Sequence, residues 1–145
     1  MKNEFTTYDI SLRLKDIGFD QPCLAFFQKE YSEVSPQLVD DSYEYRMTGF
    51  MTCKNSEIPN HYTAAPTYKS AFEWFRDTHN LFATINTDMT MEPKFCYSIV
   101  KYNQDFHSSS RFHWETIVFN SDLERTYELA EISCLDKLCQ IVENK

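Results

Sequence analysis

The sequence has few of the residues and runs on which common binding motifs depend. Only two of its 145 residues are glycine, and glycine-rich turns are what allow a backbone to approach a phosphate closely. We therefore expect neither a phosphate-binding loop nor a dinucleotide-binding turn. No segment approaches the roughly 20 apolar residues of a membrane-spanning helix, and the first residues lack the apolar run of a signal peptide. These absences predict a soluble, cytoplasmic protein without a membrane partner.

Paired metal ligands are absent as well. The four histidines show no i, i+4 helical spacing, and the five cysteines show no C-x-x-C spacing. His107 and His113 flank a serine run, and with Asp105 or Glu115 they would share a metal only if that loop folded back. The cysteines lie in apolar runs and are predicted to be reduced thiols in the core: Cys23, Cys53, Cys96, Cys134 and Cys139. The prediction is therefore no metal and no cofactor.

One cysteine lies in a context that suits a nucleophile. Cys53 is followed by Lys54, and a reactive thiol needs a partly exposed, electropositive setting. Carboxylates are numerous, but no pair of them differs from an ordinary solvated surface. We therefore predict no catalytic residue and a protein that is not an enzyme.

Acidic residues outnumber basic ones. The chain carries 22 Asp and Glu against 14 Lys and Arg, which gives a net charge of −8, and no basic cluster occurs. Because phosphate contacts supply most of the affinity for nucleic acids, we expect no binding to a nucleic-acid backbone. The charge either serves solubility or provides an acidic surface that docks a basic partner or imitates nucleic acid.

The composition supports a well-filled hydrophobic core. Twelve Phe, nine Tyr and two Trp supply apolar volume, and the length suits one domain over residues 1–145. The succession of helical and alternating segments predicts the α+β class. We expect an antiparallel sheet of three to five strands packed against about three helices.

Two helices are predicted in the first half of the chain. The first spans residues 8–17; Thr6 is expected to cap it, and Gly18 to close it in a left-handed conformation. The second has Pro66 at its first position, where the missing N–H costs nothing. Its apolar stripe consists of Tyr68, Ala71, Phe72, Trp74 and Phe75.

A third helix is predicted at the C-terminal end. It begins near Thr126, unless a capping box of Ser121 and Glu124 starts it earlier. Its apolar positions form two adjacent stripes, and this wide face either packs against both the sheet and the first helix or supports a homodimer.

Period-two alternation predicts the strands. Residues 81–85, 95–101 and His113–Phe119 alternate in the second half, and the last two are joined as an antiparallel hairpin by a polar loop. Residues 23–27 predict a mostly buried strand, and residues 43–47 a further one.

Residues 31–60 form an irregular segment that is expected to face a partner. Long connections in compact domains are often functional, and tyrosine is favoured at recognition surfaces. The tyrosines suit a core equally well. The predicted binding residues are Tyr31, Asp40, Asp41, Tyr43, Tyr45 and Arg46.

Three motifs follow one another along the chain. The first begins at Leu12 and includes Gly18 and Pro22, the second runs over residues 65–76, and the third over residues 127–138. In this order they resemble a family of small uncharacterised proteins encoded by phages and prophages of Bacteroidetes bacteria. The resemblance brings no catalytic residues and no cofactor. It implies a mobile-element context, with the host cytoplasm as the location.

The leading functional prediction is a non-enzymatic interaction protein that binds a host protein as a counter-defence or regulatory factor. One alternative is a protein that sequesters a nucleotide signal, with phosphates met by Arg46, Lys54, Lys101 or Arg111. Another alternative is a virion-associated structural protein.

Overall fold

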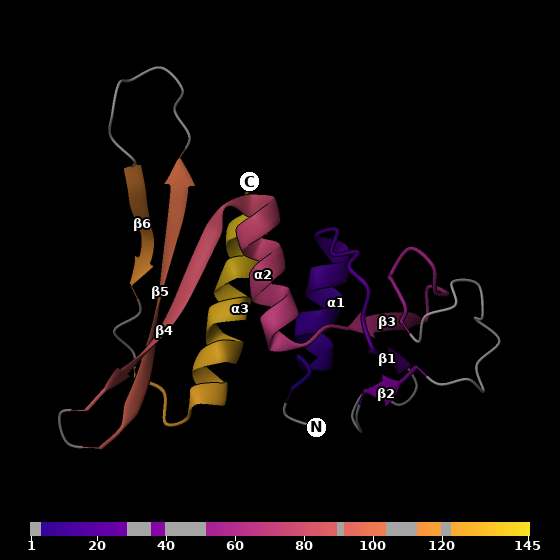
Figure 1. Cartoon of the computed structure of the whole chain (residues 1–145), viewed down its shortest axis with the longest axis horizontal. Helices are drawn as coiled ribbons and strands as arrows, with labels where there is room; N and C mark the ends of the chain where they lie inside the picture. The colour runs from indigo at the N-terminus through magenta and orange to yellow at the C-terminus, as the bar shows by residue number, and fades with distance from the viewer. Residues whose placement is uncertain (1–3, 29–35, 40–51, 90–91, 104–112, 120–122) are drawn as a thin grey trace. The chain divides into compact units, whose positions relative to one another are not determined.

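The computed structural model describes residues 4–28, 36–39, 52–89, 92–103, 113–119 and 123–145 (Figure 1). These residues form three helices and two three-stranded antiparallel sheets, so the predicted α+β class is confirmed. The chain divides into two compact units, Met1–Ala71 and Phe72–Lys145. The single domain over residues 1–145 stays a prediction. Among the described residues, no helix combines the length and apolarity that a membrane span requires.

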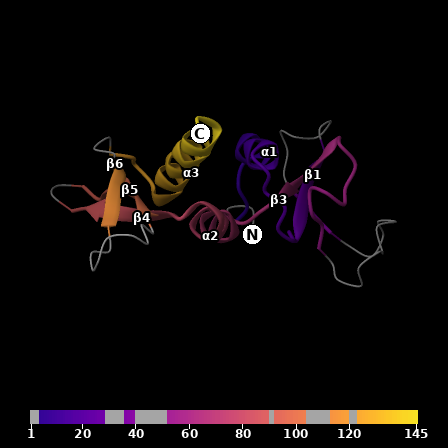
Figure 2. The same ribbon diagram turned by 90° about the horizontal axis from the view of Figure 1, so that it is seen from above.

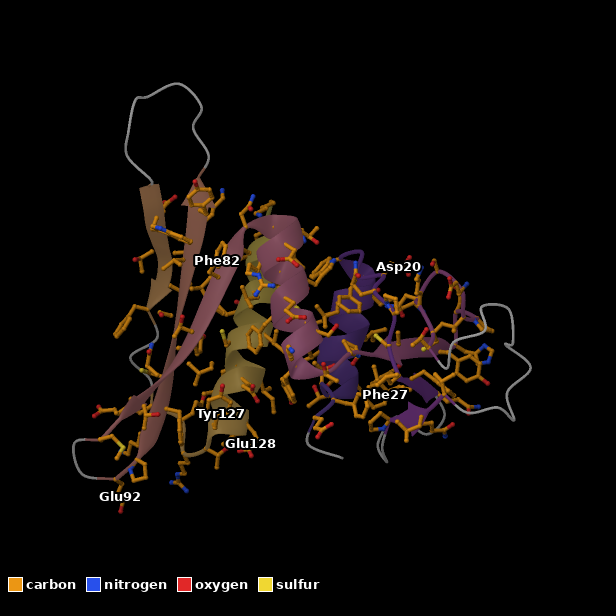
Figure 3. The ribbon with its side chains drawn as sticks, in the orientation of Figure 1. Asp20, Phe27, Phe82, Glu92, Tyr127 and Glu128 are labelled. Carbon is orange, nitrogen blue, oxygen red and sulfur yellow. The ribbon has the colours of Figure 1, made fainter. Side chains whose placement is uncertain are left out.

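The first unit is a small sheet with one helix packed on it. Helix α1 (Tyr8–Asp16) contacts strand β3 (Tyr62–Ala65). Strand β1 (Ala25–Gln28) is central, between β3 and the short β2 (Gln37–Leu38), and both pairings are antiparallel. The buried apolar side chains of this unit include Leu14, Phe19, Phe26 and Phe27 (Phe27 is labelled in Figure 3).

The N-terminal end of α1 is capped by a different residue than predicted, whereas the C-terminal end is closed as predicted. Thr7, not Thr6, is the N-cap: its hydroxyl accepts a hydrogen bond from the N–H of Ile10 at 3.4 Å. Thr6 is buried instead, and its hydroxyl donates to the carbonyl of Pro66 at 3.2 Å. Gly18 has φ +94°, and the Phe19 N–H reaches back to the Leu14 carbonyl at 2.8 Å, which confirms the left-handed closure.

Helix α2 (Tyr68–His79) crosses the boundary between the two units. The prediction of Pro66 at its first position is wrong. Thr67 caps the helix, because its hydroxyl accepts from the Ser70 N–H at 3.1 Å, while the Pro66 carbonyl accepts from the Thr6 N–H at 2.9 Å. Asn80 then takes a positive φ of 55°, and the chain turns directly into a strand.

The second unit is a meander of three strands with a helix on one side. Strands β4 (Leu81–Asp88), β5 (Lys94–Asn103) and β6 (His113–Phe119) pair in that order, antiparallel, as predicted for the last two. Helix α3 (Tyr127–Glu143) packs on β5 and β4 and lies beside this sheet in Figures 1 and 2.

Helix α3 begins where the preferred prediction placed it. Thr126 is the N-cap, and its hydroxyl accepts from the Leu129 N–H at 3.2 Å. Glu124 pairs with Phe95 in an isolated bridge rather than opening the helix. Both predicted stripes supply the buried residues of the helix: Ala130, Cys134, Leu135, Leu138 and Cys139. The homodimer through this helix stays a prediction.

Candidate interaction surface

One face of the β4–β5–β6 sheet is covered by α3. Side chains alternate between the two faces of a strand, and Tyr97 and Ile99 of β5 are both buried. Phe95, on the same side of β5, places its ring 5.9 Å from that of Tyr127 at the start of α3 (Tyr127 is labelled in Figure 3). This face is therefore part of the core of the second unit.

The opposite face carries an exposed aromatic cluster. Phe82 of β4 lies opposite Val100, and Tyr102 of β5 lies opposite Trp114 of β6. The Trp114 ring is 4.9 Å from the Phe82 ring in an edge-to-face arrangement, and 5.1 Å from the Tyr102 ring. Trp114 is nevertheless 54% exposed. The three rings hold one another in place while a large aromatic area stays in contact with water.

Apart from Asp88 and Lys94 at its far end, the rest of the described part of this surface is uncharged. We call it the open face, and the register assigns to it Phe82, Thr84, Asn86, Cys96, Ser98, Val100, Tyr102, Trp114, Thr116 and Phe119. Hydroxyl and amide groups thus accompany the aromatic rings. The only oppositely charged cross-strand pair among the described residues on this side, Asp88 with Lys94, lies beyond Asn86 at the far end. A chain with net charge −8 therefore presents a neutral surface here.

Strand β6 is an edge strand that a bulge interrupts. Ile99 pairs with Val118, but Val100 pairs with Thr116, so Ile117 is an extra residue on β6. A bulge twists an edge and breaks the regular row of backbone groups that another strand would need. The faces of the sheet, rather than this edge, are thus the better candidates for recognition.

The binding residues predicted from the sequence lie outside the described residues. This holds for Tyr31, Asp40, Asp41, Tyr43, Tyr45 and Arg46, for the strand predicted over residues 43–47, and for Asp105, His107 and Arg111. Their role stays a prediction.

Cys53 is not the exposed thiol that the sequence suggested. Its side chain is 7% exposed, and burial raises its pKa to about 11, with a smaller contribution from the charge of Glu57. Lys54 forms an ion pair with Glu57 at 3.6 Å instead of standing alone beside the thiol. A thiol with a raised pKa is a poor nucleophile at neutral pH. The sequence places Lys54 beside Cys53, but in the fold the charge of Glu57 also acts on this thiol.

The histidines do not assemble a metal site in the described part of the chain, where no group of three His, Cys, Asp or Glu could hold an ion. The Nε2 atom of His79 is buried and has no hydrogen-bond partner among the described residues. Its ring lies 4.8 Å from that of Trp74. Burial, and then the charge of Lys145, lower the pKa of His79. A neutral imidazole packed among aromatic rings is a structural element of the second unit.

The open face was missed although the sequence carried its signal. The alternation of residues 95–101 separates Phe95, Tyr97 and Ile99 on one side of the strand from Cys96, Ser98 and Val100 on the other. Pairing Tyr102 with Trp114 requires the register of the hairpin, and the placement of Phe119 opposite Ser98 requires the bulge at Ile117.

Comparison with known proteins adds no relative. No protein-family model, no curated protein and no solved structure matches this chain. The resemblance to phage and prophage proteins of Bacteroidetes therefore stays a prediction.

Proposed function

We propose that this protein is a non-enzymatic, phage-encoded interaction protein, and that it binds a host protein through the open face. The observation that carries the proposal is the uncharged cluster of Phe82, Tyr102 and Trp114, which leaves Trp114 54% exposed. A counter-defence or regulatory role in the host cytoplasm belongs to the same proposal.

The composition of the open face suits the centre of a protein interface. Such centres are enriched in Tyr, Trp and Phe and depleted of charge, and Trp and Tyr are frequent hot spots. Rings that are already held by their neighbours lose little conformational entropy on binding. Hydroxyl and amide groups such as those of Ser98 and Thr116 provide hydrogen bonds around the aromatic centre.

The net charge indicates the chemistry of the partner. A chain of net charge −8 attracts a surface with basic residues around its binding site and speeds their encounter. A second copy of the chain would bring two molecules of the same negative sign together. We therefore expect a partner with an apolar, uncharged centre and a basic rim.

An affinity purification from infected host cells tests the proposal. Tagged wild type should retain a stoichiometric host protein in native mass spectrometry, and Trp114→Ser should lose it. Leu24→Ser is the matched control, because Leu24 is an apolar side chain that is 57% exposed in the first unit. Equal retention by wild type and Trp114→Ser would remove the open face as the binding site, and no specific host protein in any sample would remove the proposal.

The two alternative functions have less support. Sequestration of a nucleotide signal needs free cations, but Lys54 is paired with Glu57. Calorimetry with a panel of cyclic nucleotides tests this alternative. A virion-associated role would be supported if a proteomic survey found the protein in purified particles.

A further inference from the structure

Two of the cysteines lie directly opposite each other. Cys23 and Cys53 form an isolated antiparallel bridge in the first unit, and each donates its N–H to the carbonyl of the other at 2.8 Å. In such a hydrogen-bonded pair the Cα atoms are about 5.5 Å apart, which lies within the roughly 4.4–6.8 Å that disulfides span. Directly opposite Cβ atoms are about 4.5–5.5 Å apart, so the two backbone segments must move slightly closer to reach the roughly 3.5–4.5 Å of a disulfide. Opposite side chains share one side of the pair, and both thiols are buried.

The two backbone segments are held in register by contacts that do not involve sulfur. The Asp20 carboxylate accepts from the N–H and the hydroxyl of Ser56 at 2.8 and 2.7 Å. The Asn55 side chain donates to the Phe19 carbonyl at 2.8 Å and accepts from the Ala64 N–H at 2.9 Å. The segment that follows Cys53 is therefore fastened both to the segment that precedes Cys23 and to β3, which gives each thiol a high effective concentration at the other.

We propose that Cys23 and Cys53 are a modification site, at which a low-molecular-weight disulfide such as glutathione disulfide oxidises the thiol pair to an intramolecular disulfide. One cysteine thiolate attacks glutathione disulfide, forms a mixed disulfide and releases one glutathione, which takes up the proton. The second thiolate attacks the cysteine sulfur of the mixed disulfide and releases the second glutathione. The pair loses two electrons and two protons, and one glutathione disulfide becomes two thiols.

The surroundings of the sulfurs determine how fast this happens. Burial raises the pKa of Cys23 to about 12 and that of Cys53 to about 11, so little thiolate is present and oxidation is slow. The Sγ atoms of Cys23 and Cys53 donate weak hydrogen bonds to the carbonyls of Gln21 and Ala25, at 3.4 and 3.5 Å. Side-chain rotation breaks these bonds when the sulfurs meet, and the buried disulfide is then protected from external thiols.

The remaining cysteines provide an internal comparison. Cys96 lies opposite Asn86 in the β4–β5 ladder, and Cys134 and Cys139 are both on α3. None of the three lies in the first unit. Oxidation of the folded chain is therefore expected to be specific for one pair.

The test uses the full chain, first reduced and then equilibrated without denaturant in buffers of increasing glutathione disulfide. After alkylation in denaturant, intact mass and peptide mapping should show three alkylated thiols and a peptide of Cys23 joined to a peptide of Cys53. Reduction with dithiothreitol in denaturant before alkylation should restore five alkylated thiols. Five alkylated thiols in the most oxidising buffer, a link between other cysteines, or a persistent glutathione adduct on Cys53 would each overturn the proposal.

Stability provides a second readout. The disulfide closes a ring that contains β1 and β2 and restricts the unfolded chain, so the urea midpoint of the oxidised protein should rise by roughly 1 M or more. Cys96→Ser should form the same link and show the same rise. Cys23→Ser should show neither, and Cys53→Ser replaces it if Cys23→Ser does not fold. An oxidised wild type with an unchanged midpoint would contradict the proposed ring.

Discussion

The two faces of the β4–β5–β6 sheet differ in what their side chains do, although the same strands supply both. Ile99 of β5 is fully buried under the α3 side, while its neighbour Val100 is half-buried on the open face. The covered face gains its energy from closing apolar surface against a helix. On the open face the aromatic rings contact one another and still keep exposed area.

This difference teaches where stability and recognition are located. An antiparallel sheet can bury one face and leave the other in water, and a solvated face usually carries charge or small polar groups. Here the solvated face carries Trp114, Tyr102 and Phe82 without a charge among them, which is more aromatic area than solubility requires. Substitutions on the two faces should therefore change different measurements.

The largest expected effect is on the covered face. Ile99→Ala removes a fully buried side chain and leaves a cavity, so the free energy of unfolding should fall by about 2–4 kcal/mol. Both tryptophans belong to the second unit, so urea unfolding followed by tryptophan fluorescence reports on this unit. Val100→Ala is the matched variant on the open face, and its cost should stay under about 1 kcal/mol. Equal losses of unfolding free energy in Ile99→Ala and Val100→Ala would contradict the distinction between the two faces.

A second effect separates binding from stability. Trp114→Ser should weaken affinity for the purified partner at least about tenfold, because it removes the centre of the aromatic cluster. Its urea midpoint should change less than that of Ile99→Ala. Trp74 is buried and Trp114 exposed, so acrylamide quenching of wild type should fall when the partner covers Trp114. Quenching that is unaffected by a bound partner would place the interface elsewhere.

Local signals explain what the sequence could predict. The start of α3 at Thr126 and the closure of α1 at Gly18 depend on residues within a few positions of each other. The bounds of β6, His113–Phe119, follow from the alternation of the strand itself. Period and capping chemistry were sufficient in each of these cases.

Pairing between distant segments explains what the sequence could not predict. Strands β2 and β3 are short, and their assignment rests on hydrogen bonds to β1 rather than on their own pattern. The burial of Cys53 depends on Cys23, which is far away in the chain. The open face depends on the register of a hairpin with a bulge at Ile117. Such information is contained in contacts between segments, not in any one window of residues.

A smaller effect concerns α3, the helix that covers one face of the sheet. Thr126 caps α3, so Thr126→Ala should lower the free energy of unfolding by about 1 kcal/mol. Thr126→Ser keeps the hydroxyl and is the control, expected to stay near wild type. Because α3 lies against the covered face, affinity of the folded protein for its partner should not change in either variant. A loss of affinity in Thr126→Ala alone would mean that α3 contributes to binding.

The smallest effect is a pH dependence of stability that comes from Glu131 on α3, the helix of the covered face. Burial, and then the charge of Glu128, raise the pKa of Glu131 on α3 above its ordinary value of 4.5. The folded state therefore disfavours the ionised carboxylate. The resulting loss of folding stability is absent below the pKa of Glu131 in the unfolded chain, and it is complete once the pH has risen through the raised pKa of the folded state.

Glu131→Gln should consequently be more stable than wild type at pH 7, and this advantage should disappear as the pH falls towards 4.5. Urea midpoints measured across this range give the comparison. In Glu128→Gln the like-charged neighbour is gone while burial remains, so the pH dependence that Glu131 contributes should weaken without vanishing. Glu131 lies on α3 against the covered face, and the open face carries no carboxylate between Phe82 and Asn86. The affinity for the partner should therefore be the same for Glu131→Gln and wild type at pH 7. A pH-independent gain in stability would show instead that the carboxylate of Glu131 is already solvated in the folded protein.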